Sequence, residues 1–265
     1  MQRFVSSFWL AALAVAVLSQ TVTAAPALVT DRSLLGGNDF VDWSVLGPPV
    51  PPVPIPPPWV DSPIQTPSAS GELDVEVVTT QGDNPAARFR RVDEGTVLGT
   101  GWRGNFGIGD ALLFSTLLST GPFSIEFSEP VFGAGAQVQS SLLGTFRGRI
   151  RAFDSGGSEV LDQTVTGASN IQQNDSAIFL GVRASTPVIQ RIEISVESLV
   201  IVSLFPFQTG YIDAPFAINQ LDINREERPI AQPIPVFGGA GAGFLVLLVL
   251  ATGLFFARNG RRLDG

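Results

Sequence analysis

Short runs in which apolar and polar residues alternate dominate the middle of the chain. Residues 73–77 (LDVEV) and 123–127 (FSIEF) carry an apolar side chain at every second position, and residues 134–139 and 191–197 repeat the pattern. Successive side chains of a strand point to opposite faces, so each run predicts a strand with one dry and one wet face. Clusters of Gly, Pro, Asn and Asp separate the runs, and helical periods of useful length are almost absent. The pattern therefore predicts an all-β domain.

Strands with one dry face favour two packed antiparallel sheets, so we expect an antiparallel β-sandwich over residues 25–223. Within it, residues 48–58 are rich in proline and cannot donate enough backbone hydrogen bonds to join a sheet. An extended polyproline II conformation suits this stretch, which we interpret as a stiff surface connection. Recognition of a partner protein is the alternative interpretation.

The N-terminus has the layout of a secretory signal peptide over residues 1–24. Arg3 supplies the positive charge, residues 8–18 form a short apolar core, and small residues follow. We expect cleavage after Ala24, because cleavage after Ala25 would place Pro26 next to the scissile bond. The pattern predicts that the protein is exported.

The C-terminus predicts a single membrane span. Residues 236–257 contain no charge, and a helix of that length crosses a hydrocarbon core of about 30 Å. A polar tether, residues 224–235, precedes the helix, and an arginine-rich tail, residues 258–265, follows it. The positive-inside rule keeps Arg258, Arg261 and Arg262 in the cytoplasm and places the β domain outside the inner membrane.

Composition removes several classes of chemistry. The chain has no Cys and no His, and its basic residues are all Arg. Disulfides and Ser-His-Asp or Cys-His catalytic groups are therefore excluded, and we expect no cofactor. Without the signal peptide and the tail, 12 Arg stand against 23 Asp and Glu, a formal charge of -11. That charge repels phosphate backbones, so nucleic acid is not an expected partner.

Three arginines form the most pronounced charged pattern. Arg147, Arg149 and Arg151 alternate in FRGRIRAF and would lie on one face of a strand. A guanidinium group can bind a carboxylate through two parallel hydrogen bonds, so the row of arginines is a candidate site for an anionic polysaccharide or a carboxylate-rich ligand. The alternative is cross-strand pairing with acidic side chains such as Glu193 and Glu197.

Trp102 and Asn174 mark two further loops that are candidates for ligand binding. A tryptophan ring can stack on a sugar, which supports a carbohydrate-binding hypothesis in which a sandwich face or these loops recognise the ligand. The alternative for Trp102 is burial in the domain.

Four oxygen-bearing residues suggest a structural calcium site. Asp39 and Asp42 lie near the start of the domain, and Asn219 and Asp222 lie near its end. If the first and last strands pair, these oxygens could meet, and calcium takes six to eight such ligands. Capping of turns is the alternative role for acidic loop residues.

A glycoside hydrolase is the enzymatic alternative, since it needs two carboxylates. Glu193 and Glu197 would lie on one face of a strand, roughly 13 Å apart at strand rise. Retaining and inverting glycosidases both need a shorter separation, so this pair alone does not form a catalytic site. We therefore expect a protein that is not an enzyme.

The C-terminus resembles the sorting signal of PEP-CTERM proteins. The proline motif with Pro233 and Pro235, the apolar helix and the arginine cluster match its three parts, although Ile234 stands between the prolines and the usual Glu is absent. The resemblance implies recognition by an exosortase, an integral-membrane processing enzyme, in organisms that make extracellular polysaccharide. It implies passage through the inner membrane to the cell surface or the extracellular matrix.

The domain also resembles uncharacterised exported proteins that carry this tail. The similar stretches are GGNDFVDWSVLG (36–47), GNFGIGDALLF (104–114), GAGAQVQ (133–139), NDSAIFLGV (174–182) and FAINQLDI (216–223). The resemblance implies a jelly-roll-like sandwich in which DFVDWSVLG lies near FAINQLDI. The resemblance indicates no particular activity. It favours a non-enzymatic surface or matrix protein associated with exopolysaccharide.

Overall fold

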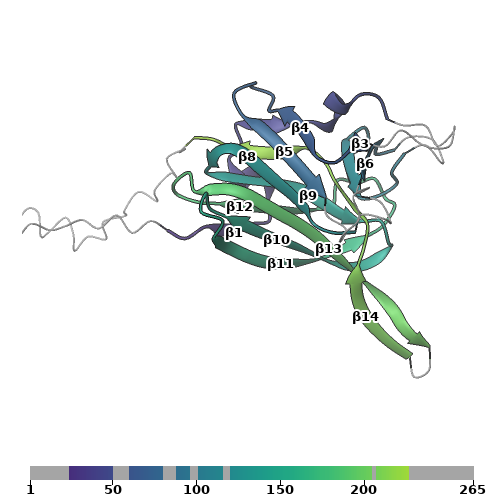
Figure 1. Ribbon diagram of the computed structural model, residues 1–265. Coiled ribbons are helices and arrows are strands. Elements are labelled where there is room, and N and C mark those ends of the chain that lie inside the picture. The colour runs from purple at the N-terminus through teal and green to yellow at the C-terminus, as the bar shows by residue number, and fades with distance from the viewer. Residues whose placement is uncertain are drawn as a thin grey trace, which may run out of the picture. The chain divides into compact units, whose positions relative to one another are not determined.

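The computed structural model describes six stretches of the chain, which together contain the β domain (Figure 1). These are residues 24–49, 60–79, 88–95, 101–115, 120–204 and 207–226, without the side chains of 202–204 and 207. The described residues all belong to one compact unit. The predicted signal peptide up to residue 23, most of the proline-rich connection, the tether beyond residue 226, the apolar helix and the arginine-rich tail lie outside the described residues.

Within the described residues the domain consists of two antiparallel sheets, which confirms the predicted all-β class. The nine-stranded sheet has the order β1 (Ala27–Val29), β12 (Ile178–Arg183), β9 (Gly133–Ser140), β15 (Phe216–Ile218), β7 (Ala111–Ser115), β6 (Arg88–Asp93) and β3 (Val60–Asp61). Two more strands complete it: β16 (Leu221–Asn224) pairs with β9 and with β2 (Asp39–Val41).

The seven-stranded sheet has the order β11 (Glu159–Ser169), β10 (Gly144–Phe153), β13 (Ile189–Leu204), β8 (Phe123–Val131), β5 (Asp74–Thr79) and β4 (Ile64–Pro67). A seventh strand, β14 (Phe207–Asp213), pairs with the far end of β13. The described helices are short: α1 (Arg32–Leu35) and the 3-10 turn η1 (Trp43–Leu46). No helix in these described stretches has the length and apolar character needed to cross a bilayer.

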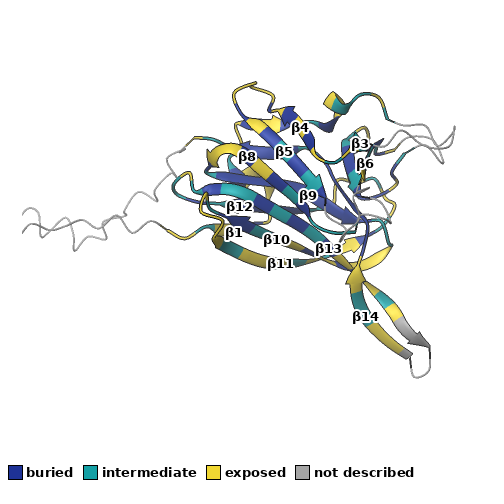
Figure 2. Cartoon of the chain, in the orientation of Figure 1, coloured by how far each residue is buried: buried dark blue, intermediate teal, exposed yellow. Residues whose placement is uncertain are grey.

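The apolar rows of both sheets face each other and form one core (Figure 2). Ile125 and Ile194 of the seven-stranded sheet belong to the same buried cluster as Val138 and Leu180 of the nine-stranded sheet. Phe123 contacts Phe216 across the two layers, with ring centroids 4.4 Å apart. The domain is therefore a β-sandwich, as the alternating pattern predicted.

The predicted strands at 73–77, 123–127 and 191–197 have the expected faces, with their apolar side chains buried. The strand at 134–139 differs, because β9 is buried on both faces. Gln137 and Gln139 point away from the core, yet they are 8% and 1% exposed. The loop of residues 101–110 covers Gln139, which accepts from the Asn105 backbone amide at 2.6 Å, and Gln137 donates to Asp175 of a second loop at 2.9 Å. Sequence alternation alone does not reveal such a covering loop.

The first and last parts of the domain pair, as the sequence suggested. Strand β2 runs antiparallel to β16, with Val41 opposite Leu221 and Asp39 opposite Ile223. The indole nitrogen of Trp43 also donates to the Asn219 carbonyl at 2.7 Å, which fixes η1 against the turn before β16. The DFVDWSVLG and FAINQLDI segments thus lie side by side.

The two faces of β13 give a direct test of this arrangement. Ile194 is fully buried opposite Ile150 of β10, whereas its neighbour Ser195 points outward. We expect Ile194→Ala to lower the free energy of unfolding by about 2–5 kcal/mol, because it leaves a cavity. The control Ser195→Ala should change it by less than about 0.5 kcal/mol. Urea titrations followed by circular dichroism measure both, and equal effects of the two substitutions would contradict the assigned faces.

Candidate functional site

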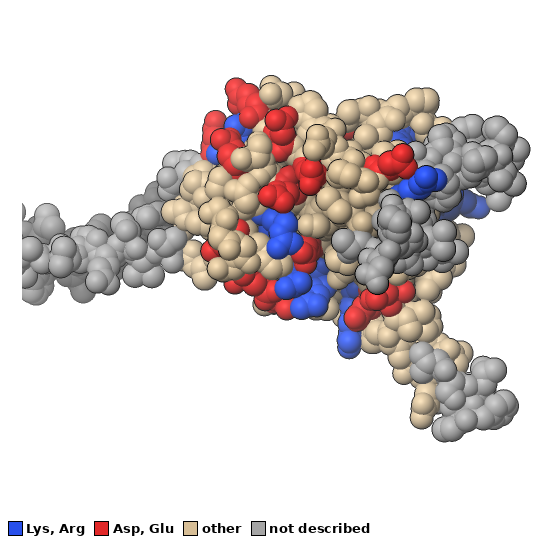
Figure 3. All heavy atoms as spheres, in the orientation of Figure 1, with Lys and Arg blue, Asp and Glu red and all other residues tan. Residues whose placement is uncertain are grey.

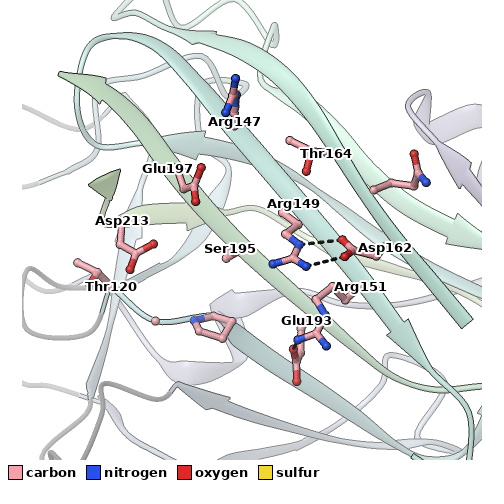
Figure 4. A pocket seen from close by; sticks show the side chains of 13 residues that line it. Thr120, Arg147, Arg149, Arg151, Asp162, Thr164, Glu193, Ser195, Glu197 and Asp213 are labelled. Atoms are coloured by element: carbon pink, nitrogen blue, oxygen red, sulfur yellow. Dashed lines mark hydrogen bonds and ion pairs between the residues drawn. The ribbon is translucent and has the colours of Figure 1, made fainter. Parts of the chain in front are cut away.

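An open groove of about 810 Å³ runs along the outer face of the seven-stranded sheet (Figure 4). Its floor is made by β10, β11 and β13, and β14 and residues 120–122 border it. The lining residues are Thr120, Gly121, Pro122, Arg147, Arg149, Arg151, Asp162, Gln163, Thr164, Glu193, Ser195, Glu197 and Asp213. All three arginines that the sequence singled out therefore lie in one groove.

Strand alternation explains why the arginines share a face. Phe146, Ile150 and Ala152 of β10 are buried in the core, so the alternate residues of this strand point outward. The register of β10 and β13 then sets Arg147 opposite Glu197 and Arg151 opposite Glu193. Apolar burial on one face thus builds a row of opposite charges on the other face.

The middle arginine is held by an acid on the neighbouring strand. Arg149 donates from Nε and Nη2 to the two carboxylate oxygens of Asp162, at 2.7 and 2.5 Å. The hydrogen bond from Arg149 is the main cause that lowers the pKa of Asp162. Both side chains are exposed, so water screens the pair and its contribution to stability is small. The pair fixes the positions of these groups at the surface.

At one end of the groove the charges are fully paired. Arg151 contacts Glu159 at 2.6 Å and Glu193 at 2.9 Å, and Arg191 forms a second ion pair with Glu193. The guanidinium groups of Arg151 and Arg191 also lie over the ring of Phe153, at 4.8 and 3.8 Å from its centroid. The expected cross-strand pair with Glu193 is thus present at Arg151.

The other end of the groove keeps its polar groups available. Arg147 does not pair with Glu197; instead its guanidinium lies 3.8 Å from the centroid of the Tyr211 ring. Glu197 lies directly opposite Asp213 of β14, and both are exposed. In the part of the chain that the structure describes, these two carboxylates have no hydrogen bond or ion pair. This end of the groove therefore offers two carboxylates that can accept hydrogen bonds, beside an arginine that can donate them and is stacked on Tyr211.

The charges of the groove are mixed and slightly acidic. Three arginines face four carboxylates, and Figure 3 shows acidic and basic side chains interspersed on one face of the molecule. Two of the arginines are already paired with protein carboxylates. An anionic ligand would have to displace these partners and approach Glu197 and Asp213. The groove therefore suits a neutral ligand rich in hydroxyl groups better than an anionic polymer.

Trp102 is buried, which is the alternative that the sequence left open for it. Its side chain is 9% exposed, and it packs against Phe106 and Phe114 on the outer side of the nine-stranded sheet. The indole nitrogen donates to Gln139 at 3.2 Å. A sugar needs access to the face of the ring, and Trp102 does not offer one. The groove lies on the outer face of the seven-stranded sheet, whereas Trp102 packs against the nine-stranded sheet.

Asn174 is exposed in a loop that contacts the Trp102 loop. The Gln173 amide donates to the Gly104 carbonyl at 2.7 Å, so the structure does bring these two loops together. The side chain of Asn174 serves its own loop: it donates to Gln172 and accepts from Ser176 at 2.6 Å. Neither loop contributes a residue to the groove.

The four candidate calcium ligands do not converge in the structure. Asp39 lies opposite Ile223, whereas Asp222 lies opposite Phe40, so the two carboxylates point to opposite faces of the β2–β16 pair. Among the described residues, no group of three acidic side chains could hold a metal ion.

Each of the four side chains has a structural role instead. Asp39 accepts hydrogen bonds from the hydroxyls of Ser68 and Ser70, at 2.6 and 2.7 Å. Asp42 caps η1, and Asp222 pairs with Arg32 at 2.8 Å. The side chain of Asn219 bridges β9, α1 and the start of β7, through the contacts Arg32–Asn219, Asn219–Asp110 and Asn219–Gln137.

Sequence reasoning missed Asp162 and Asp213, which line the groove, and Tyr211, whose ring stacks against the Arg147 guanidinium. Asp162, Thr164 and Thr166 alternate in β11, and Tyr211 and Asp213 alternate in β14. The alternation could have placed each set on one face of its strand. It could not show that β11 and β14 border the arginine row, because strand order is set by the fold.

No family model matches the chain, and no curated protein matches it. Among solved structures, the chain is similar to a DUF4465 family protein from Bacteroides caccae ATCC 43185, at 11% identity and a TM-score of 0.34 over 76% of this chain and 100% of that one. It is similar to TmCBM61 in complex with beta-1,4-galactotriose, at 15% identity and a TM-score of 0.22 over 57% and 82%. A third is a mutant of CBM29-2, a family 29 carbohydrate-binding module, at 10% identity and a TM-score of 0.21 over 62% and 99%. Likenesses at these TM-scores carry no argument about function, so the proposal below rests on the groove.

A buried acid next to the Trp102 loop gives a prediction on pH. Glu94 is 1% exposed and accepts from the Gly104 amide at 2.9 Å. Burial raises the pKa of its carboxyl above the ordinary value of 4.5. The Glu94 carboxyl therefore keeps its proton to higher pH in the folded chain than in the unfolded chain. The protonated carboxyl contributes to stability at pH values below its ordinary pKa, and this contribution is lost as the pH rises through its pKa in the folded chain.

We expect Glu94→Gln to remain stable over that range, because the amide keeps an acceptor for Gly104 and carries no charge. The difference in unfolding free energy between the variant and the unmodified chain should grow with pH by at most about 1.4 kcal/mol per pH unit, the effect of one proton. Urea titrations from pH 4 upward, at about one-unit steps, measure it. The exposed Glu197→Gln is the control, and a difference that does not depend on pH would contradict the assignment.

Proposed function

We propose that this protein is an exported, non-enzymatic polysaccharide-binding protein, and that its ligand lies in the groove on the seven-stranded sheet. The observation that supports this most directly is the free end of the groove, where Glu197 and Asp213 lie beside the stacked Arg147 and Tyr211 pair. Each sugar hydroxyl both donates and accepts a hydrogen bond, so neighbouring acceptors and donors suit it. The groove is open along the sheet face, as a polymer requires.

The charge balance favours a neutral polysaccharide over an acidic one. The domain carries a formal charge of -11, and the groove itself has one more carboxylate than it has arginines. A uronic-acid polymer would meet repulsion both on approach and in the groove. A neutral polymer meets neither. The sequence led us to expect an association with exopolysaccharide. We propose that the groove binds the neutral segments of such a polymer.

The second candidate is a glycoside hydrolase, which one observation favours. Glu197 and Asp213 are direct cross-strand neighbours, a position that brings their Cβ atoms to about 5 Å. Retaining glycosidases use two carboxyl groups about 5–5.5 Å apart. Both residues are exposed at the border of the groove, whereas a glycosidase places its two carboxyl groups on either side of the scissile bond of a bound sugar. Glu193 is held by Arg151 and Arg191, which leaves it no free role as an acid or base.

We also infer that the sandwich is jelly-roll-like. From β7 to β15 the chain alternates between the two sheets, except at the hairpins β10–β11 and β13–β14, which stay within the seven-stranded sheet. The resulting inner orders, β12-β9-β15-β7 and β11-β10-β13-β8, support this topology. Each sheet then contains two strands from the first half of this path and two from the second, as two intertwined Greek keys require.

The proposed address follows from the two ends of the sequence. We propose that residues 1–24 direct export and that residues 236–257 hold the chain in the inner membrane, with the domain outside. The proline motif, the helix and the arginine cluster support recognition by an exosortase-like enzyme and transfer to the cell surface or the surrounding matrix. A polysaccharide-binding domain would then meet its ligand at the place of delivery.

Binding assays with two groove variants test the proposed function. Neutral glucans, galactans and mannans are compared with alginate and polygalacturonate in affinity electrophoresis or calorimetry. We expect binding to a neutral polymer that Arg147→Ala and Asp213→Asn each weaken about tenfold, because the first removes a charged donor and the second removes the charge of an acceptor. Arg183→Ala and Asp74→Asn, which lie outside the groove, are the matched controls.

Three results would contradict the proposal: binding to none of the polymers, stronger binding to the uronates, or equal losses in the control variants. Release of reducing ends from a bound polymer, abolished by Glu197→Gln, would instead establish the hydrolase.

The intact mass of the protein in each cell fraction tests the proposed address. We expect a chain that starts at Ala25 and lacks the residues after about Pro235, found at the cell surface or in the medium. A chain that keeps residues 236–265 and stays in the inner membrane would show a permanent anchor and contradict exosortase processing. Retention of residues 1–24 would contradict export through a cleaved signal.

A further inference from the structure

The hairpin formed by the end of β13 and β14 extends away from both sheets (Figure 1). Strand β13 pairs with β10 only as far as Ser198 and with β8 only as far as Ile194. Beyond Ser198, its partner among the described residues is β14 alone. On its other side, β14 has no strand partner in the described part of the chain. Its outer edge therefore presents backbone donors and acceptors to the surroundings.

The hairpin is uncharged and exposes apolar side chains. Residues 198–212 contain no Asp, Glu or Arg, although the domain as a whole is strongly acidic. Leu199, Ile201 and Ile212 are 37%, 59% and 45% exposed. Leu199 and Ile201 share the face of Tyr211, whereas Ile212 lies on the opposite face. These three apolar side chains are exposed on both faces of the hairpin, so they do not contribute to the core of the domain.

The other edge strands carry the features that normally prevent pairing between molecules. In the described residues, β1, β2 and β3 have three residues or fewer, and β4 has four and ends at Pro67. The long edge strand β11 carries Glu159 and Asp162. Short strands, proline and charges all discourage contact along an edge. Strand β14 has seven residues, and its one charge, Asp213, lies at its base.

The hairpin also lies at the end of the domain opposite to the point where the chain leaves it. The last described residues follow β16, where Arg225 pairs with Glu72 and Glu129, both at 2.8 Å. Glu129 is near the end of β8, whereas the hairpin continues β13 beyond the position of Phe123, at the start of β8. A chain tethered through its C-terminus would therefore hold the hairpin away from its point of attachment.

We propose that the outer edge of β14 pairs with β14 of a second copy of this protein. Two acidic domains repel each other, so a contact between copies is most favourable through an element that carries no charge and projects from the body. A twofold axis makes the two β14 strands antiparallel and joins the seven-stranded sheets of both copies through the hairpins. Leu199, Ile201 and Ile212 of each copy then gain apolar contacts beside the new backbone hydrogen bonds. The groove of each copy stays open.

Single-cysteine cross-linking tests this pairing without background, because the chain has no natural Cys. Cys is introduced one position at a time at residues 208–212 of the full-length chain, and isolated membranes or secreted protein are oxidised with copper phenanthroline. Opposite residues of antiparallel strands have Cα atoms about 4.5–5.5 Å apart, which suits a disulfide. We expect a disulfide-linked dimer that peaks at one or two of these positions. Ala168→Cys, exposed on β11 at the other edge of the same sheet, is the control.

A charge at the same edge gives the second test. We expect Thr209→Lys, at an exposed position of β14, to weaken dimerisation at least about tenfold in sedimentation experiments, because two like charges meet near the axis. Ala168→Lys should leave it unchanged. Cross-links no stronger than in the Ala168→Cys control, or a monomer at every concentration, would overturn the proposal. Loss of polysaccharide or vesicle binding in Thr209→Lys without any dimer would also overturn it and identify the other occupant of the hairpin. The cross-linking and sedimentation results do not depend on ligand binding in the groove, so they can fail or succeed independently of the proposed function.

Discussion

Burial of one apolar row from each strand between the two sheets is the constraint on which the remaining structure depends. In β10 and β13, Ile150 faces Ile194 inside the core, and this contact fixes the register of both strands. A slip of one residue would move the arginines of β10 into the core, at a prohibitive cost in desolvation. The row of arginines and acids on the outer face is thus a consequence of packing on the inner face.

The two outer faces of the sandwich are used differently. Over β9, the loop of residues 101–110 covers the nine-stranded sheet, and the Gln139 side chain beneath it is hydrogen-bonded within the protein: it accepts from Trp102 and Asn105 and donates to Ser169. A buried polar network of this kind stabilises one arrangement and leaves little for a ligand to bind. The face over β10 and β13 has no such cover among the described residues, and its polar groups line an open groove.

The groove and the projecting hairpin suggest how weak contacts could combine. If the groove binds polysaccharide as proposed, its exposed, charged surface would give modest affinity for one stretch of polymer, because water competes for every polar group. Two copies joined through β14 would present two grooves on one continued sheet, and a polymer that reaches both would bind more tightly than it binds to either one. The same logic holds for many copies on one surface. Selection would then act on the spacing of the sites as much as on their contacts.

The sequence by itself determined the all-β class, the strands at 73–77, 123–127 and 191–197, and the common face of Arg147, Arg149 and Arg151, because alternation with a period of two is a local property. Only the tertiary structure decided what lies beside that face. It brought Asp162 to Arg149 and Tyr211 to Arg147, and it packed Trp102 against Phe106 and Phe114 and turned Asp39 away from Asp222. These outcomes depend on strand order and on long-range packing, which join residues that no local pattern relates.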